Sequence, residues 1–226
     1  MEKLSRFQRL KNKIYYNIFI EFNNNKKIDF QFSKEMRWDL INEIIKKKNI
    51  KSYLEIGCDD NLLFDKIKLD GKIGIDPRQG GNMKTTSDNF FSTNQKYFDL
   101  VFIDGLHEFE QVNKDIENSL NFLNNGGFIL LHDCLPTQCD IQAVPRYRHY
   151  WTGDVWKSIV KFRHRKDLFI QTLLIDMGVG IIQKKENPNP LNLNINNFKK
   201  LKFSDFYQNH QNFMNEVSYK DFIKNI

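Results

Sequence analysis

From Tyr53 onward, short apolar runs alternate with polar segments of helical periodicity, and this alternation limits the folds open to the chain. A short apolar run suits a strand that is buried on both faces, and the segments between the runs are long enough for crossover helices. Repeated strand–helix units predict a parallel sheet covered by helices. The predicted strands are Tyr53–Ile56, Lys72–Ile75, Leu100–Ile103 and Phe128–Leu131.

Helices are predicted between these strands. One runs from about Asn61 to Lys68, and a longer one runs from about Phe109 to Leu123 and stops at Asn124–Gly127. A third is predicted to begin after Asp154 as its N-cap.

The last two apolar runs predict an antiparallel hairpin. Leu168–Ile175 and Val179–Gln183 are joined by the tight turn of Asp176, Met177 and Gly178. The sheet is therefore expected to be parallel except at this edge.

Helical segments flank the sheet region. Apolar residues from Leu4 to Phe22 recur at three- and four-residue steps, which predicts an amphipathic helix. We expect it to pack on the domain as a cover, in preference to a membrane-surface helix, because its polar positions carry Asn and Gln as well as Lys. Ser33 is predicted to cap a helix that ends near Lys48 and carries one apolar face, made of Met36, Leu40, Ile41, Ile44 and Ile45.

Length and pattern together predict one domain with two extensions. A chain of 226 residues leaves little room for two complete domains. The expected division is an N-terminal helical extension over 1–32, a cofactor-binding domain over 33–185 and a C-terminal helical extension over 186–226. In the last part, 187–197 is expected to be irregular and 203–226 to form one or two helices.

Composition excludes several classes of protein. Hydrophobic residues make up 40% and charged residues 27% of the chain, as in an ordinary globular protein, and no apolar run is long enough to span a membrane. The three cysteines, Cys58, Cys134 and Cys139, have no disulfide or zinc spacing, which with the lack of a signal sequence favours a cytoplasmic location. The net charge of +6 comes from scattered lysines, so we expect no nucleic-acid partner.

Ligands of open parallel sheets bind beyond the carboxyl ends of the strands, where this sequence places polar residues and glycines. Gly57 follows the first strand, but the three glycines of a dinucleotide-binding turn are absent, which disfavours a nicotinamide enzyme. Asp76 ends the second strand, about 20 residues later, where a carboxylate can accept both ribose hydroxyls of a nucleoside.

Four ionisable residues follow two neighbouring strands. Asp104 and His107 come after one strand, and His132 and Asp133 after the next. Two imidazoles and two carboxylates at adjacent strand ends are typical of a catalytic site. His107 is the best candidate for the base, and the acids would orient it or stabilise its charged form.

The chain resembles the class I S-adenosylmethionine (SAM) dependent methyltransferases. Within them it is most similar to the subgroup of macrolide sugar O-methyltransferases and enzymes of bacterial surface-polysaccharide clusters. The resemblance covers about Leu40 to Gln183 and rests on LEIGC, GIDP, TTSDNFF, FDLVFIDGLH, NNGGFILLHDC and GDVWKSIV. It implies a Rossmann-like α/β fold, with a seven-stranded, mostly parallel sheet whose last strand is antiparallel and helices on both faces.

The resemblance also implies a set of cofactor contacts. Glu55 and Gly57 would form the turn at the methionine end, Asp76 would hold the ribose, and Thr86 to Asp88 would lie near the adenine. The implied SAM-binding residues are Glu55, Gly57, Asn61, Asp76, Thr86, Ser87, Asp88 and Asp104.

In the macrolide sugar enzymes, the counterparts of Asp104, His132 and Asp133 form a magnesium site and the counterpart of His107 acts as the base. Here His132 stands where those enzymes carry an acid. Imidazole is a poor ligand for a hard cation that prefers oxygen, so Mg²⁺ dependence is doubtful.

A loop after the last parallel strand is the candidate acceptor-binding segment. It carries Arg146, Tyr147, Arg148 and Trp151, and guanidinium groups bind phosphates and carboxylates bidentately. The alternative, an ordinary solvated loop, is equally compatible with the sequence.

These observations predict transfer of a methyl group from SAM to a hydroxyl or amine of a small polar acceptor, such as a sugar or capsular polysaccharide precursor, with S-adenosylhomocysteine as the other product. An N-methyltransferase of a small phosphorylated amine and a catalytically inactive binding protein with the same fold are the alternatives. The acceptor's identity and a homo-oligomeric state are left open.

Overall fold

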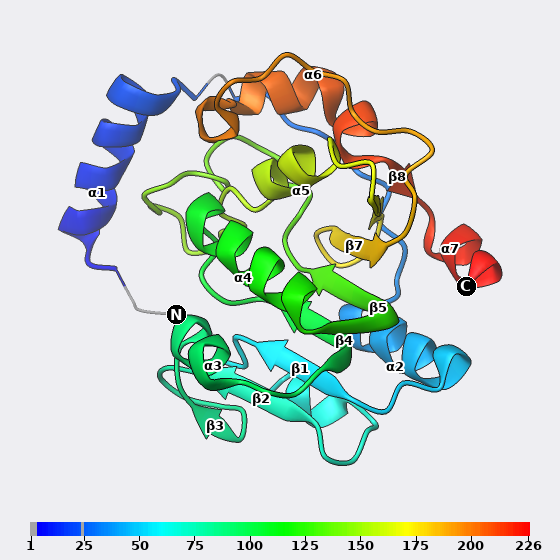
Figure 1. Ribbon diagram of the computed structural model, residues 1–226. Helices are drawn as coiled ribbons and strands as arrows, with labels where there is room; N and C mark the ends of the chain where they lie inside the picture. The colour runs from blue at the N-terminus through cyan, green and yellow to red at the C-terminus, as the bar shows by residue number, and fades with distance from the viewer. Residues whose placement is uncertain (1–3, 24) are drawn as a thin grey trace.

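The computed structural model describes residues 4–23 and 25–226, in which one eight-stranded sheet carries helices on both faces (Figure 1). The strand order is β3-β2-β1-β4-β5-β7-β6-β8. The strands are β1 (Tyr53–Ile56), β2 (Ile73–Asp76), β3 (Met83–Lys84), β4 (Phe98–Ile103), β5 (Leu123–Leu131), β6 (Leu168–Leu173), β7 (Val179–Lys184) and β8 (Glu216–Val217).

Seven α-helices are assigned in the described part of the chain. They are α1 (Arg6–Tyr15), α2 (Arg37–Lys48), α3 (Ser87–Thr93), α4 (Phe109–Asn121), α5 (Trp156–Phe162), α6 (Phe203–Met214) and α7 (Tyr219–Asn225). A π-helix, η1 (Tyr16–Ile20), and two 3₁₀ turns, η2 (Phe64–Lys66) and η3 (Phe198–Lys200), complete the elements.

Alternating strand residues divide the core into two layers. On β4, Val101 and Ile103 pack into the cluster that contains α3, α4, α5 and α6. Leu100 and Phe102 point to the other face, into the cluster with α2 and α7. Both faces are apolar, which explains why the parallel strands read as continuous apolar runs.

The predicted α/β fold class is confirmed, with eight strands in place of seven. Two of the eight, β3 and β8, are additional to the six strands predicted from apolar runs, and at two residues each they are too short to produce a pattern in the sequence. The predicted hairpin is also confirmed, because β7 runs antiparallel to both β6 and β5. The two predicted C-terminal helices are α6 and α7.

Some predicted helix boundaries were wrong. The segment 61–68 forms only the turn η2, because Asp59 and Asn61 adopt positive φ angles of 43° and 65° that prevent a helix from starting there. The cap of α2 is Met36 instead of Ser33. The cap of α5 is Val155. Asp154 instead accepts a hydrogen bond from the backbone N–H of Phe109, the first residue of α4. Asn124–Gly127 lies within β5.

The amphipathic helix near the N-terminus is present as α1 and η1, but its apolar side does not cover the domain as expected, and only Tyr16 of η1 is buried in the core. No residue of α1 is buried, and large apolar side chains including Phe7, Ile18 and Phe22 are exposed. The described residues contain no helix long and apolar enough to cross a membrane.

Candidate active site

The carboxyl ends of β1, β2, β4 and β5 meet at one edge of the sheet, beside a cavity of about 430 Å³. The strand register places Ile56 next to both Ile75 and Ile103, so the residues that follow these strands converge. Seven predicted site residues line the cavity, namely Gly57, Asp76, Thr86, Ser87, Asp88, Asp104 and His107.

Gly57 allows two strand-end loops to approach each other closely. Its φ is +90°, and a Cβ atom there would lie 2.4 Å from the carbonyl oxygen of Asp104. Any side chain at this position would be strained and would also push Asp104 away from the cavity.

Asp76 is held in place by backbone amides. Its Oδ1 accepts hydrogen bonds from the backbone N–H groups of Arg78 (2.8 Å) and Gln79 (3.1 Å), and its Oδ2 accepts one from Asp59 (3.1 Å). A carboxylate has about four acceptor positions, so it can still accept a bond from a ligand. Asp76 is therefore a fixed acceptor at one end of the cavity.

Two predicted cofactor residues do not line the cavity. Glu55 is buried and accepts a hydrogen bond from the hydroxyl of Tyr53 (2.7 Å), and burial raises the pKa of its carboxyl to about 7. Asn61 Oδ1 accepts a bond from the backbone N–H of Gly81 (2.6 Å). Their role in cofactor binding stays a prediction.

Gln111 and Asp115 line the same cavity, although the sequence analysis did not identify them. Gln111 Nε2 donates to Ser87 Oγ (3.2 Å), Asp88 Oδ1 (3.1 Å) and Asp115 Oδ1 (3.1 Å). Burial raises the pKa of Asp115 to about 6. A sequence signal was available, since Asp115 lies between the apolar residues Val112 and Ile116, which face the core.

All four predicted catalytic residues form one cluster. His107 Nε2 lies 3.2 Å from Asp104 Oδ1, and its Nδ1 lies 3.0 Å from Asp133 Oδ2. His132 Nδ1 lies 3.3 Å from Asp104 Oδ1 and 3.4 Å from Asp133 Oδ1. Within the described chain, His107 Nδ1 and His132 Nε2 have no hydrogen-bond partner of good geometry, so the contacts of these two atoms are ion pairs.

The cluster continues into two residues that the sequence analysis missed. His132 Nε2 lies 3.5 Å from Asp176 Oδ1, and Arg37 Nη1 donates to Asp176 Oδ2 at 2.7 Å. Three carboxylates thus alternate with three basic groups. Asp176 reaches this edge because its turn is hydrogen-bonded to the segment that follows β5. The backbone N–H of Cys134 donates to the carbonyl of Gly178 (3.0 Å).

The alternation of charges shifts the protonation equilibria. Burial disfavours a charged imidazole, but the close carboxylates of Asp104 and Asp133 outweigh it and raise the pKa of His107 to about 10. The pKa of His132 is likewise raised well above its ordinary value, because Asp133 and Asp104 overcome the effect of burial. Burial opposes ionisation of Asp104, yet His132 and His107 hold its pKa well below the usual range.

The loop before α5 fixes the position of His107. The Trp151 ring stacks on the imidazole, with centroids 5.4 Å apart and planes 10° apart. The backbone N–H of Asp154 donates to the carbonyl of His107 (3.1 Å), and a Cβ atom on Gly153 would lie 1.8 Å from that oxygen. The loop and His107 are in contact along the backbone as well as through the rings.

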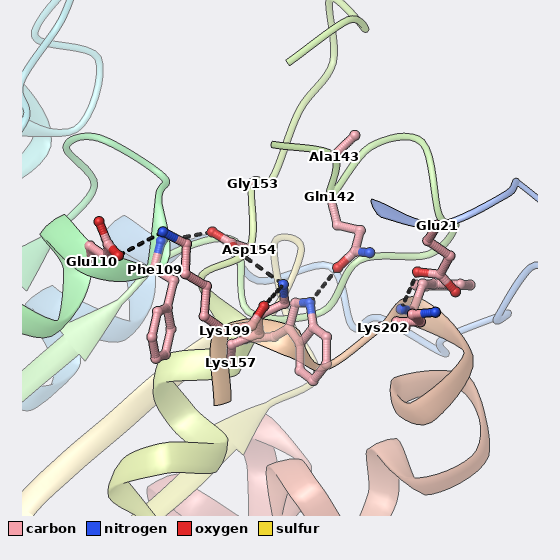
Figure 2. Close-up of polar contacts among 12 residues, drawn as sticks. Glu21, Phe109, Glu110, Gln142, Ala143, Gly153, Asp154, Lys157, Lys199 and Lys202 are labelled. Carbon is pink, nitrogen blue, oxygen red and sulfur yellow. Dashed lines mark hydrogen bonds and ion pairs between the residues drawn. The ribbon is translucent and has the colours of Figure 1, made fainter. Parts of the chain in front are cut away.

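Asp154 connects this loop to the start of α4 (Figure 2). Its Oδ1 accepts from the backbone N–H of Phe109 (2.7 Å), and its Oδ2 lies 3.2 Å from Lys157 Nζ, which also donates to the carbonyl of Lys199 (3.0 Å). His107 is therefore held on both sides, by Asp154 and by the helix that begins two residues later.

The predicted acceptor residues divide into two groups. Trp151 lies on His107, and the Arg146 guanidinium lies 5.6 Å from the centre of the Trp151 ring. Arg148 Nε instead donates to Asp140 Oδ2 (2.6 Å), and Tyr147 is buried against Tyr16. Only the first pair, Arg146 and Trp151, lies beside the His107 side of the candidate catalytic cluster.

The donor set of the cluster does not fit magnesium. Among the described residues, the group that could hold an ion is Asp104, His107 and Asp133, whose ligand atoms lie within 4.8 Å of one another. One of these donors is an imidazole, and both carboxylates already face histidines. Mg²⁺ requires near-octahedral oxygen ligation, so no step is assigned to it.

Comparison with known proteins relates the segment that carries this cluster to methyltransferases. A family model described as "Methyltransferase domain" matches residues 76–134, a segment that contains Asp76 and the four residues of the candidate catalytic cluster. No curated protein matches the chain.

Two solved structures have a similar fold. The O-methyltransferase TomG from Streptomyces achromogenes, involved in tomaymycin synthesis and solved in complex with SAM, is 13% identical, with 81% of this chain and 91% of that chain covered and a TM-score of 0.50. A cofactor-bound protein from MTB is 12% identical, with 79% and 88% covered and a TM-score of 0.51. The chain therefore has the Rossmann-like fold of SAM-dependent methyltransferases.

We predict that Asp154→Ala destabilises the protein by about 3–5 kcal/mol, because it leaves the buried ammonium of Lys157 without its counter-charge and removes the acceptor for the Phe109 amide. Urea unfolding measures this change. Glu110→Ala, which removes an exposed partner of Lys199 in the same region (Figure 2), should leave the unfolding midpoint nearly unchanged. Equal midpoints for the two variants would contradict the assigned role of Asp154.

Proposed function

We propose that the protein transfers the methyl group of SAM to a hydroxyl or amine of a small polar acceptor, such as a sugar or a polysaccharide precursor. The observation that carries this proposal is a single cavity lined both by a fixed carboxylate, Asp76 at the end of β2, and by the imidazole of His107 after β4, with β1 between these strands. A nucleoside bound at Asp76 would direct its methyl-bearing end toward His107.

The chemistry requires alignment and removal of a proton. The acceptor attacks the methyl carbon, the bond from that carbon to sulfur breaks, and S-adenosylhomocysteine leaves as a neutral thioether. A hydroxyl acceptor must lose its proton during the attack, and neutral His107 would take it. Asp104 and Asp133 would then stabilise the imidazolium through the contacts described above.

The acceptor-side contacts favour a sugar over a small phosphorylated amine. A phosphate site would draw on both arginines of the loop, but Arg148 is engaged with the buried carboxylate of Asp140. Turnover on panels of sugar nucleotides and of phosphoamines separates the two acceptors. Mass-spectrometric detection of methylated products in a polar metabolite extract would identify the acceptor, and absence of any methylated product would favour the inactive binding protein.

We predict that Asp76→Ala weakens SAM binding by about 1.5–3 kcal/mol, the scale for losing hydrogen bonds to a charged acceptor. Isothermal titration measures the change. Asp70→Ala, which removes an exposed carboxylate that does not line the cavity, serves as the matched control and should bind SAM as the wild type does. Wild-type affinity in Asp76→Ala would remove this residue as the ribose anchor.

We predict that His107→Ala lowers the methylation rate about 10²–10⁴-fold and leaves SAM affinity nearly unchanged, as expected for loss of a positioned base. Because the raised pKa, about 10, keeps the imidazole charged near neutrality, the wild-type kcat/KM should rise with pH well above pH 8.

The control for this variant is His149→Ala, which removes an exposed imidazole from the same loop region and should retain activity. A fully active His107→Ala enzyme would mean that the acceptor arrives deprotonated or that His132 is the base, and His132→Ala distinguishes those two cases.

We predict that activity survives chelation by EDTA, because two imidazoles compete for the carboxylates of the presumed metal site. The assay compares turnover before and after EDTA treatment. Loss of activity that added Mg²⁺ restores would show that the cluster works as a magnesium site.

A further inference from the structure

The apolar side of α1 and η1 faces solvent. Phe7, Leu10, Ile14 and Ile18 follow each other at three- and four-residue steps and so lie on one side of the helix. Their side chains are between 51% and 76% exposed. Phe19 and Phe22, at and just after the end of this segment, are also exposed apolar side chains, at 69% and 76%. In Figure 1, α1 stands at the margin of the molecule, apart from the helices that cover the sheet.

The opposite side of the same helix is attached to the protein. Asn12 Nδ2 donates to the carbonyl of Arg146 (2.7 Å), and the buried Tyr16 hydroxyl accepts a bond from Gln142 Nε2 (2.9 Å). Asn12 and Tyr16 are four residues apart and share one side. The apolar side cannot turn toward the core unless these bonds break.

The chain directly after η1 is anchored too. The carboxylate of Glu21, labelled in Figure 2, accepts hydrogen bonds from the backbone N–H groups of Phe203 (2.6 Å) and Ser204 (2.9 Å), at the start of α6. This end of the helical segment is fixed on the domain, and its apolar side is left uncovered.

The exposed part of this segment carries positive charge only. Arg6, Arg9, Lys11 and Lys13 are all exposed, and residues 4–20 contain no Asp or Glu. Glu21, the next acid along the chain, is buried by its contacts with α6. The segment therefore presents large apolar side chains beside four cations.

We infer that α1 and η1 form a docking surface for an anionic lipid bilayer. The Phe, Leu and Ile side chains would enter the boundary between headgroups and acyl chains, and Arg6, Lys11 and Lys13 would face lipid phosphates. The helix would lie on the bilayer, in keeping with its length, which is too short to cross one.

A second copy of the chain fits this surface less well. Symmetric pairing of two α1 helices would bury the apolar sides but would bring the same four cations of each copy together. Like charges in close contact are destabilising, whereas lipid phosphates neutralise them. The charge of the surface therefore favours the bilayer.

Flotation of the full chain with vesicles tests the inference. We expect it to float with vesicles that contain phosphatidylglycerol and phosphatidylcholine, to float weakly with vesicles of phosphatidylcholine alone, and to be released by salt. Equal binding to both kinds of vesicle, or binding to neither, would overturn the inference.

Paired variants identify the surface. Ile14→Ser/Ile18→Ser should weaken binding at least about tenfold, because less apolar surface is buried. Lys11→Gln/Lys13→Gln should weaken it about 25-fold, at about fivefold for each cation. The matched control Lys46→Gln/Lys48→Gln removes the same charge from the exposed end of α2 and should bind as the wild type does.

Two further measurements keep the test decisive. Circular dichroism should show that every variant is folded, because each substituted side chain is exposed. Light scattering reports the oligomeric state. A stable dimer that Ile14→Ser/Ile18→Ser converts to a monomer would mean that a second copy covers this face, and would overturn the inference.

Discussion

The candidate site depends on the alternation of charges at the carboxyl ends of β4 and β5. Asp104, Asp133 and Asp176 are each in contact with at least one of Arg37, His107 and His132. Transfer of single charges into a protein interior costs several kcal/mol, so each buried carboxylate depends on its basic neighbours. The close approach of the loops at Gly57 and the turn at Asp176 bring these groups together.

The same alternation links the site to the stability of the fold. The pKa of His107 is about 10 in the folded protein, against an ordinary value of 6.5. Its protonation therefore stabilises the folded state fully below about pH 6.5, and this contribution is lost as the pH rises through about 10. The proposed catalysis needs a neutral imidazole and is favoured toward pH 10, whereas the folded state is stabilised by a charged imidazole and is favoured toward pH 6.5.

Much of the fold could be predicted because its parallel strands are buried on both faces. β1 has the predicted bounds, and the convergence of Asp104, His107, His132 and Asp133 follows from strand ends that share one edge. The parts of the site that could not be predicted depend on contacts between residues far apart in the sequence. Arg37 and Asp176 are separated by 139 residues, and Asp154 caps a helix that begins 45 residues before it. The periodicity of α1 correctly predicted a helix but contains no information on what covers its apolar side.

The central claim is that the histidines of this cluster are held charged by their carboxylate neighbours. An NMR titration of the histidine ring protons, in wild type and in Asp133→Asn, measures this directly. We predict that the His107 resonances do not titrate below about pH 8, that the pKa of His132 lies well above its ordinary value, and that the pKa of His107 falls when Asp133 loses its charge. Titration of both rings near 6.5 in the wild type, unchanged in Asp133→Asn, would contradict it.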